Sequence, residues 1–320
     1  MKPKKVWVLY GGESAEHDVS VKTGANIVAA LKAKGFEVTA LPFKSRDQIP
    51  SFFAQTKPDI VFLGLHGTFG EDGVIQGFLE TIKVPYVGSG VLSSALCFNK
   101  LTTQKILKHH KIPVASFLEL QRNTFSVQDL VKAEPRFLEK KYFIKAASQG
   151  STLGVYRYNP ADYVEAEKKE AFEDLCAKAF QFDSELIVED WIEGRELTVP
   201  VVFSQAFPVI EIRPNSKFYD YQSKYTAGET EYLCPAPIEK EITQKVQSCS
   251  EEVSKVLKCQ DYVRVDFILK DSGDFVVLEA NTLPGMTATS LVPKSAKAKG
   301  IDFESFIEML VLKSYERQTQ

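Results

Sequence analysis

Apolar and β-branched residues alternate with other residues in two neighbouring segments near the carboxyl end of the chain, at 262–269 and 275–281. Alternation with a period of two is typical of β-strands that bury one face. The short polar break at 271–274 contains a glycine, so the pattern predicts a hairpin. A four-residue loop there would pair Lys270 with Phe275.

This register predicts a polar face on the hairpin, because directly opposed residues of paired strands point to the same side. Facing carboxylates repel each other unless a cation lies between them. Oxygen ligands of this kind suit Mg²⁺, which binds one or two carboxylates together with substrate phosphates. A solvated sheet face is the alternative, and an odd-length loop would instead place Asp266 beside Leu278 or Ala280. The residues that the predicted register brings together are Arg264, Asp266, Glu279 and Asn281.

Apolar runs of the buried-strand type alternate with helical patterns over roughly residues 1–100. The first helical pattern has an apolar stripe of helical period and ends at Lys34 and Gly35, which form a usual helix stop. Strands that alternate with helices indicate a parallel, doubly wound α/β sheet. The predicted strands are 6–10, 38–41, 59–65 and 85–87, and a second helix is predicted over 73–82.

The rest of the chain mixes strands and helices less regularly. The segment 213–235 has no apolar period, yet it contains five aromatic residues, and long aromatic loops often act as lids over a site. The sequence predicts strands over 143–145, 185–189 and 197–203, and helices over 101–111, 239–258 and 302–314.

Composition narrows the class of protein. The 320 residues suffice for two or three domains. A net charge of −3 gives no overall field that favours nucleic acid or an anionic membrane. The basic N-terminus precedes an apolar run that is too short for a signal peptide, and no stretch approaches a membrane span. Five widely spaced cysteines without a C-x-x-C pattern indicate reduced thiols in a cytoplasm.

Several groups could hold a nucleotide. The turn at 11–17 presents N–H groups to an anion, and Lys145 precedes the glycine-bracketed loop 149–154, where a lysine could clamp phosphate. Glu189 and Glu196 could accept hydrogen bonds from an adenine amine or from ribose hydroxyls. Taken singly, these features also fit an ordinary turn, a surface lysine and solvated acidic residues. The sequence lacks the G-x-x-x-x-G-K-[ST] and G-x-G-x-x-G patterns, which argues against a P-loop NTPase and a nicotinamide dehydrogenase.

Two further positions suggest catalysis. His66 follows a predicted strand, and ligands bind at the carboxyl ends of strands in open α/β sheets. Gly285 lies in a Pro-Gly turn after Asn281 and permits close backbone approach. Its N–H, together with the Arg264 guanidinium, could stabilise an oxyanion beside the metal, although a simple turn is the alternative.

Taken together, these features resemble the ATP-grasp ligases, and closely the D-alanine–D-alanine ligases, over nearly the whole chain. The resemblance implies an ATP-grasp fold, with a Rossmann-like substrate domain at 1–100, a central lid subdomain at 101–187, and a C-terminal subdomain at 188–320 that holds the metal site and the aromatic loop. The motifs that carry it are Gly11-Gly12-Glu13-Ser14-Ala15-Glu16-His17-Asp18-Val19-Ser20, Leu65-His66-Gly67, Gly70-Glu71-Asp72-Gly73, Phe218-Tyr219-Asp220-Tyr221, Lys224-Tyr225, Arg264-Val265-Asp266, Glu279-Ala280-Asn281-Thr282, Pro284-Gly285-Met286-Thr287 and Ser290-Leu291-Val292-Pro293.

The family joins two D-alanines with ATP. One carboxylate attacks the γ-phosphate to form an acyl phosphate, and the amine of the second D-alanine then attacks the acyl carbon. Because all the partners are anionic, metal ions and lysines must screen them. The resemblance implies ATP and two Mg²⁺ (or Mn²⁺) ions as cofactors. It places Asp266, Glu279 and Asn281 at the metals, Lys100, Lys145 and Lys224 at the phosphates, and Ser151, Glu189, Trp191 and Glu196 around the rest of the nucleotide.

The resemblance also implies roles toward the amino acids. Glu16 would bind the ammonium of the first D-alanine with His66 nearby, and Ser290 and Leu291 would hold the second D-alanine. Arg264 and the Gly285 N–H would stabilise the tetrahedral oxyanion. Ser151 and Tyr225 would link to Glu16 and close the aromatic loop, because an acyl phosphate exposed to water hydrolyses.

Tyr225 bears on the product, since family relatives that make a D-alanine–D-lactate ester lack this tyrosine. Its presence favours an amine acceptor. Ala146 stands where the family usually has proline, and Thr152 where a second serine is more usual. Neither departure touches the proposed metal or substrate groups.

The resemblance implies a cytoplasmic homodimer that acts on two molecules of D-alanine, with no nucleic acid or membrane partner. Two rival functions remain. One is an ATP-grasp ligase for another acceptor, such as a D-hydroxy acid. The other is a protein that binds Mg-ATP without turnover, which would show as the loss of Arg264 or a metal ligand, and neither is lost.

Overall fold

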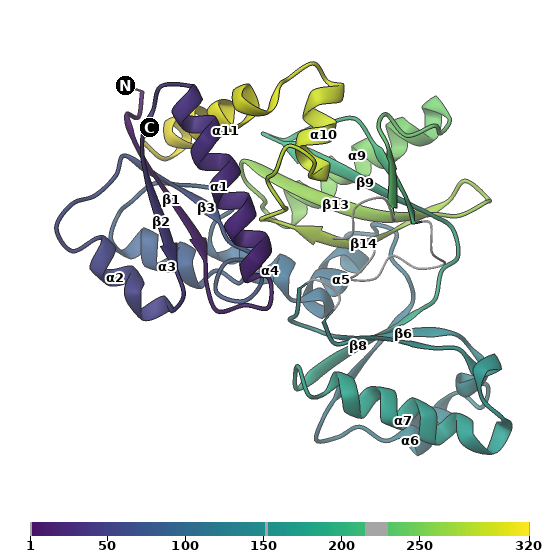
Figure 1. Cartoon of the computed structure of the whole chain (residues 1–320). Helices are drawn as coiled ribbons and strands as arrows, with labels where there is room; N and C mark the ends of the chain where they lie inside the picture. The colour runs from purple at the N-terminus through teal and green to yellow at the C-terminus, as the bar shows by residue number, and fades with distance from the viewer. Residues whose placement is uncertain (1, 151–152, 215–229, 320) are drawn as a thin grey trace.

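The computed structural model describes residues 2–150, 153–214 and 230–319. Three β-sheets organise this part of the chain (Figure 1). The first belongs to the N-terminal part, the second forms the lobe at the bottom of the view, and the third lies between the C-terminal helices and that lobe. The first sheet is parallel, and the other two are antiparallel.

The N-terminal sheet is parallel, as the alternation of strands and helices predicted. Its strands lie in the order β2-β1-β3-β4, and all five residues of β3 are buried. Such continuous apolar runs are expected for strands covered on both faces. The elements are β1 (Lys5–Gly11), α1 (His17–Ala33), β2 (Glu37–Phe43), α2 (Ile49–Phe52), β3 (Ile60–Gly64), α3 (Val74–Thr81) and β4 (Tyr86–Val87).

The last helix of the chain, α11 (Phe303–Thr319), returns to this N-terminal sheet and packs beside α1 (Figure 1). Its apolar face is fully buried in the same core cluster as β1 and β3. The two ends of the chain therefore share one hydrophobic core. The buried apolar residues of α11 are Phe306, Ile307, Leu310 and Val311.

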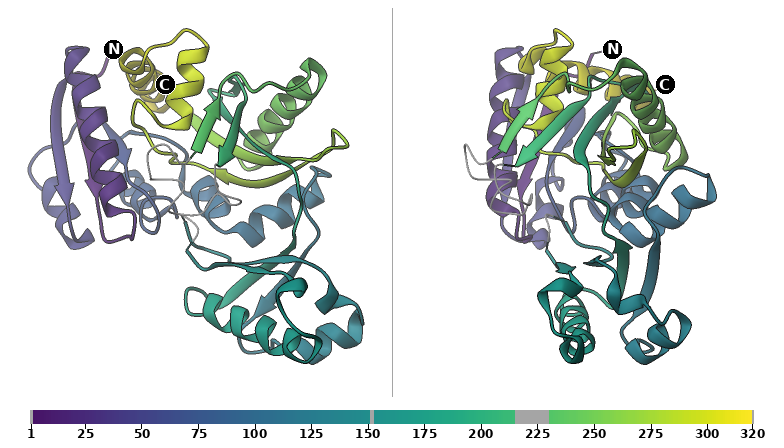
Figure 2. Two further views of the ribbon diagram at one scale, coloured as in Figure 1. Left: turned by 45° about the vertical axis from the view of Figure 1, so that its right-hand side comes forward. Right: turned by 90° about the vertical axis from the view of Figure 1, so that its right-hand side faces the viewer.

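The second sheet is an antiparallel unit in the order β5-β8-β6-β7 that α6 and α7 cover on one face, as the two views in Figure 2 also show. Its core is rich in stacked and edge-on aromatic rings, with Phe137 and Tyr142 centred 4.7 Å apart. The elements are β5 (Phe117–Gln121), α6 (Val127–Ala133), β6 (Tyr142–Ala146), β7 (Val155–Tyr158), α7 (Lys168–Ala179) and β8 (Glu185–Asp190). The domain boundary predicted at 187 falls inside β8, and the three domain ranges stay a prediction.

The third sheet follows the order β12-β11-β9-β13-β14, with β10 paired to β9. The expectation of one long loop over 213–235 was wrong at its ends, because Arg213 and Pro214 belong to β11 and residues 230–233 form β12. The elements are β9 (Arg195–Val202), β10 (Gln205–Ala206), β11 (Ile210–Pro214), β12 (Thr230–Leu233), α9 (Lys240–Val256), β13 (Tyr262–Leu269), β14 (Phe275–Asn281) and α10 (Leu291–Ala298), with α4 (Val91–Phe98) and α5 (Lys100–His109) linking the sheets.

The β13–β14 hairpin reaches the predicted register by an unexpected route. Its turn has three residues, not four, because the Lys270 N–H donates to the Asp274 carbonyl, and Gly273 takes the positive φ of 86° that such a turn needs. The predicted Lys270–Phe275 pair was therefore wrong. A β-bulge between Asp266 and Phe267, opposite the extra residue Leu278, restores the register. Asp266 then faces Glu279, as predicted, and Arg264 likewise faces Asn281.

An ion pair between the exposed residue Arg317 and a buried carboxylate ties α11 to the loop before β13. The Asp261 side chain is fully buried, and its two oxygens accept hydrogen bonds from Arg317 at 2.9 Å each. One of them also accepts from the Gly88 N–H at 2.8 Å, which joins β4 to the same centre. This cluster links the first and third sheets.

We expect Arg317→Ala to lower the free energy of unfolding by about 3 kcal/mol, because it leaves a buried carboxylate without its charged partner. Chemical unfolding followed by circular dichroism measures the change. Arg136→Ala is the matched control, since it removes an arginine from the exposed Arg136–Glu139 pair and should cost less than about 1 kcal/mol. Equal losses in the two variants would contradict a structural role for the Arg317–Asp261 pair.

Candidate active site

A cavity of about 1310 Å³ lies where the three sheets approach one another. Every described residue that the sequence assigned to the site contributes to its wall. Ser151, Lys224 and Tyr225 lie outside the described residues, so their predicted roles stay predictions. The assigned residues that line the cavity are Glu16, His66, Lys100, Lys145, Glu189, Trp191, Glu196, Arg264, Asp266, Glu279, Asn281, Gly285, Ser290 and Leu291.

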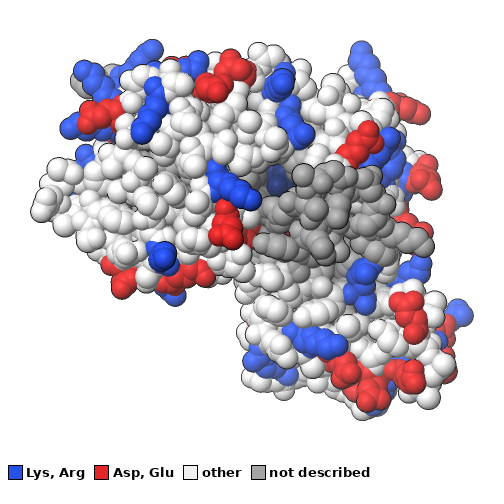
Figure 3. All heavy atoms as spheres, in the orientation of Figure 1, with Lys and Arg blue, Asp and Glu red and all other residues white. Residues whose placement is uncertain are grey.

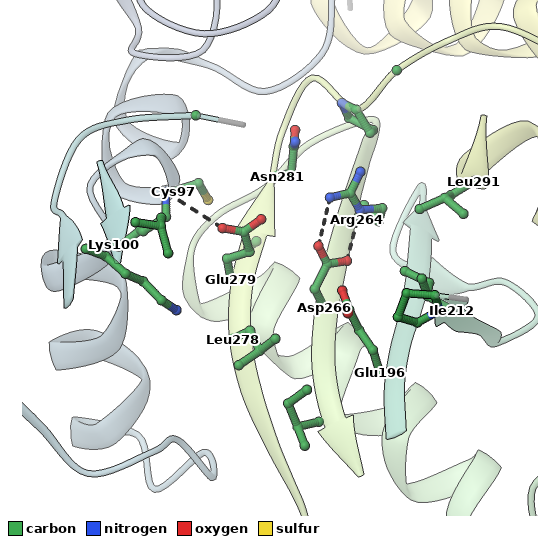
Figure 4. A pocket seen from close by; sticks show the side chains of 18 of the residues that line it. Cys97, Lys100, Glu196, Ile212, Arg264, Asp266, Leu278, Glu279, Asn281 and Leu291 are labelled. Carbon is green, nitrogen blue, oxygen red and sulfur yellow. Dashed lines mark hydrogen bonds and ion pairs between the residues drawn. The ribbon is translucent and has the colours of Figure 1, made fainter. Parts of the chain in front are cut away.

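The polar face of the β13–β14 hairpin forms one wall of this cavity (Figure 4). Arg264 and Asp266 lie two residues apart on β13, so they point to the same side and form a bidentate ion pair with distances of 2.9 and 2.7 Å. The Thr198 hydroxyl on β9 donates to the same carboxylate at 2.6 Å. Asp266 is thereby held in one orientation although it is almost fully buried.

Glu279 faces Asp266 from β14, and Asn281 follows it on the same strand (Figure 4). The Glu279 carboxylate lies 3.7 Å from the Lys100 ammonium. Cations thus sit against both carboxylates, which is what two opposed negative groups require. Among the residues that the structure describes, no three His, Cys, Asp or Glu residues gather into a metal cluster. Two carboxylates and one amide nevertheless fit Mg²⁺, whose other ligands are usually water and substrate phosphate.

Lys100 owes its position to the start of α5. Asn99 caps this helix by accepting a hydrogen bond from the Thr102 N–H at 2.7 Å. The Lys100 N–H donates to the Ala147 carbonyl at 2.8 Å, which fixes the backbone against the segment that follows β6. The ammonium therefore projects into the cavity from a fixed base.

Lys145 on β6 and Glu189 on β8 form an ion pair of 2.5 Å that the sequence did not predict. Burial alone would lower the pKa of Lys145, but the neighbouring Glu189 carboxylate, with Glu279 and Glu196 further away, raises it above its usual value. Lys145 is therefore a permanent cation available to phosphate. Beside it the rings of Phe143 and Trp191 lie 5.0 Å apart and add an apolar, aromatic wall.

Glu16 immediately precedes α1 and is 7% exposed. A side chain on Gly150 would come within 2.8 Å of its carboxylate and would force the carboxylate to shift. Glu16 thus joins the N-terminal sheet to the loop after β6, and its charge suits an ammonium ligand.

His66, just beyond β3, is buried in a hydrogen-bond network. Its Nδ1 lies 3.0 Å from the Leu283 carbonyl, and its Nε2 lies 3.0 Å from the Thr23 hydroxyl. These partners suit the tautomer with the proton on Nδ1. Glu71 Oε1 is 3.7 Å from the same Nδ1. His66 therefore ties the end of β3 to the loop that follows β14, where Gly285 lies.

The Ser290 hydroxyl, just before α10, accepts from the Thr287 N–H at 3.1 Å and contacts the Thr287 hydroxyl at 2.8 Å. A side chain on Gly285 would approach this hydroxyl to 3.1 Å. The turn predicted to supply an oxyanion donor and the serine predicted to bind a carboxylate are therefore packed together in the cavity wall.

Sequence reasoning missed three groups. Thr198 orients Asp266 from a strand whose pairing with β13 no local pattern revealed. Glu71 lies in the motif at residues 70–73, but the sequence analysis gave it no role.

The third missed group is Glu211, which is 2% exposed and accepts two hydrogen bonds from Arg195 and one from Arg213. Burial raises the pKa of Glu211, yet the two arginines outweigh it and lower the pKa overall. Only its alternation within 210–214 hinted at an inward-facing acid.

On the face shown in Figure 3, acidic and basic side chains are interspersed without an extended patch of one sign. None of the described helices is both long enough and apolar enough to cross a membrane.

Two protein-family models match the chain. The family model of the D-ala D-ala ligase C-terminus matches residues 106–312, and the family model of the N-terminus matches residues 42–89. A D-alanine–D-alanine ligase of Herminiimonas arsenicoxydans is 40% identical over 96% of this chain and 90% of its own length. D-alanine–D-alanine ligase B of Clostridium perfringens is 34% identical over 98% of this chain and 99% of its own.

Solved structures agree. The D-alanine–D-alanine ligase from Bacillus anthracis complexed with ATP superposes with a TM-score of 0.82 at 31% identity, covering 98% of each chain. A D-Ala:D-Ser ligase from Enterococcus faecalis gives 0.80 at 28% identity, covering 98% of this chain and all of the other. With both family models, full-length relatives and the described site residues in agreement, this chain belongs to the D-alanine–D-alanine ligase family of ATP-dependent ligases.

Proposed function

We propose that this enzyme joins two D-alanines into D-alanyl-D-alanine with ATP, through a D-alanyl phosphate, as a step toward peptidoglycan precursors in the cytoplasm. The observation that carries the proposal is the single cavity in which Asp266 faces Glu279 while Lys100 and Lys145 project toward the same space. Carboxylates that suit Mg²⁺ and lysines that suit phosphate are the groups that phosphoryl transfer needs.

In the first step, the carboxylate of one D-alanine attacks the γ-phosphorus, and ADP leaves. Lys100 and Lys145 bind phosphate oxygens, and Glu16 holds the ammonium of this D-alanine so that its carboxylate is oriented for attack. Asp266, Glu279 and Asn281 would hold Mg²⁺, which would supply positive charge to the phosphates. Arg264, which pairs with Asp266 in this structure, contacts the acyl oxygen.

In the second step, the ammonium of the other D-alanine gives a proton to water, the resulting amine attacks the acyl carbon, and the leaving phosphate takes the second proton from the nitrogen. Arg264 and the Gly285 N–H stabilise the resulting oxyanion, and phosphate leaves as the peptide bond forms. Ser290 and Leu291 hold the acceptor. Tyr225 and Ser151 would link to Glu16 and close the aromatic loop over these groups, which excludes water, and Lys224 would reach the γ-phosphate.

The structurally similar proteins differ in the acceptor, because the B. anthracis protein is a D-alanine–D-alanine ligase and the E. faecalis protein is a D-Ala:D-Ser ligase. The two superpose almost equally well on this chain, so the fold alone does not choose between them. Tyr225 supports an amine acceptor over a hydroxy acid, as the resemblance implies.

We expect phosphate release from Mg-ATP in the presence of D-alanine, but not of L-alanine, with D-alanyl-D-alanine as the product identified by mass. Parallel reactions of D-alanine with D-serine or D-lactate test the acceptor. A mixed product in preference to the dipeptide of D-alanine would overturn the acceptor assignment while leaving the phosphate chemistry in place. No phosphate release with any acceptor would favour a protein that binds Mg-ATP without turnover.

We expect Glu279→Gln to slow phosphate release at least roughly 100-fold, because loss of a direct ligand should exceed the effect of losing an outer hydrogen bond to a metal ligand. The fold should survive, since the Glu279 side chain is 34% exposed. Glu193→Gln is the control, an acid on the same cavity rim that is 74% exposed and pairs with Lys141. Activity near the control level in Glu279→Gln would remove the metal assignment.

We also propose a homodimer. Two neighbouring helices of the N-terminal part, α3 and α4, expose Val74 and Leu92 with 53% and 55% of their surfaces accessible. Apolar side chains of this kind are typical of protein interfaces. Light scattering should give twice the chain mass of 35.8 kDa, and Leu92→Glu should shift it toward the monomer. A monomer at micromolar concentration in the unmodified protein would contradict the proposal.

A further inference from the structure

Two cysteines far apart in the sequence meet beside the cavity. Cys97 lies in the last turn of α4, and Cys259 lies in the segment between α9 and β13. Their sulfur atoms are 3.7 Å apart although 162 residues separate them. Both are free thiols.

The two thiols have different surroundings. Cys97 is 6% exposed, whereas Cys259 is partly exposed and is flanked by the exposed residues Lys258 and Gln260. The Ser93 hydroxyl donates to the Cys259 sulfur at 3.4 Å. The hydrogen bond between the sulfurs raises the pKa of Cys97, which burial raises further, and it lowers the pKa of Cys259. Cys259 is therefore the reachable thiol and the more readily ionised one, which makes it the better nucleophile.

Cys97 is also part of the cavity wall. Figure 4 shows it beside Lys100 and Glu279. Only Phe98 and the capping residue Asn99 separate it from Lys100, and Cys259 lies five residues before Arg264. The sulfur pair thus bridges the two segments that carry the phosphate lysine and the metal-binding strand.

We propose that Cys97 and Cys259 are a redox-active pair that forms a reversible disulfide, and that this disulfide weakens binding of the nucleotide. The oxidant is a hydroperoxide. The Cys259 thiolate attacks the peroxide, the O–O bond breaks, and Cys259 becomes a sulfenic acid. The Cys97 thiol then attacks this sulfur, the S–O bond breaks, and water leaves. Two thiols lose two electrons and two protons in total, and the peroxide is reduced to water and an alcohol or a second water.

The coupling follows from geometry. A disulfide needs a sulfur separation of about 2.0 Å, so the 3.7 Å gap must close. Cys97 then moves toward Cys259, and the junction of α4 and α5 moves with it. Lys100 is held there by its N–H bond to Ala147 and its contact with Glu279, so the displacement disturbs the phosphate end of the site. The coupling rests on the proposed function, whereas disulfide formation does not.

The disulfide is tested on the full-length protein by hydrogen peroxide treatment, alkylation of remaining thiols, and mass spectrometry of unreduced peptides. We expect a peptide pair linked through Cys97 and Cys259 that disappears on reduction. It should be absent from Cys97→Ser and from Cys259→Ser and retained in the control Cys249→Ser, which alters a half-buried thiol of α9. Absence of the linked pair from the unmodified protein, under conditions that oxidise glutathione, would overturn the proposal.

The coupling is tested by calorimetric titration of Mg-ATP without D-alanine. We expect the oxidised protein to bind roughly fivefold or more weakly than the reduced protein, with full recovery after dithiothreitol and no effect of peroxide on Cys259→Ser. By reciprocity, saturating Mg-ATP should shift the thiol–disulfide equilibrium in a glutathione buffer toward the thiols by the same factor. Equal affinities in the two states would overturn the coupling. If the reduced protein binds no Mg-ATP, the proposed function is overturned. The linked peptide is measured without nucleotide, so disulfide formation is tested independently of that result.

Discussion

Two carboxylates held face to face on paired strands are the constraint around which the site is built. Asp266 and Glu279 cannot move apart, because the hairpin register fixes them, so positive charge must come to them. In this structure Arg264 and Lys100 supply it. Under the proposed function, the two carboxylates would hold Mg²⁺, and Arg264 and Lys100 would contact the substrate.

Other charged residues of the cavity wall are also paired. Lys145 on β6 is balanced by Glu189 on β8, and Glu211 on β11 by Arg195 on β9 and Arg213 on its own strand. Pairing raises the pKa of Lys145 and lowers the pKa of Glu211 despite their burial. It also makes their positions depend on one another, because a change in one strand moves a charge on the next. The cavity is therefore stiff within each sheet, and adjustments on binding are expected between the sheets.

Local periodicity predicted the parallel N-terminal sheet and the opposition of Asp266 and Glu279. The site residues were assigned from short motifs and the family resemblance; the described ones line one cavity, and their roles stay predictions. The sequence analysis misjudged the hairpin turn, where an odd loop and the bulge at Leu278 compensate each other, since two local irregularities leave the same distant pairing. It could not predict the contacts of Thr198 with Asp266 or of Cys97 with Cys259, because these join segments at least 68 residues apart. A local pattern does not show which segments that lie far apart in the sequence come into contact. Three of the residues assigned through family resemblance, Ser151, Lys224 and Tyr225, lie outside the described residues.

The return of α11 to the N-terminal sheet has a consequence for biosynthesis. Domains usually fold in order of synthesis as they leave the ribosome. Here Phe306 and Leu310 complete the core that β1 and β3 begin, so the first sheet to be made is the last to be closed. During translation its apolar surface stays uncovered until α11 emerges. A ribosome that stalls before α11 is made would hold a chain whose earlier elements have formed while the core of the N-terminal sheet is still open, the form that chaperones recognise.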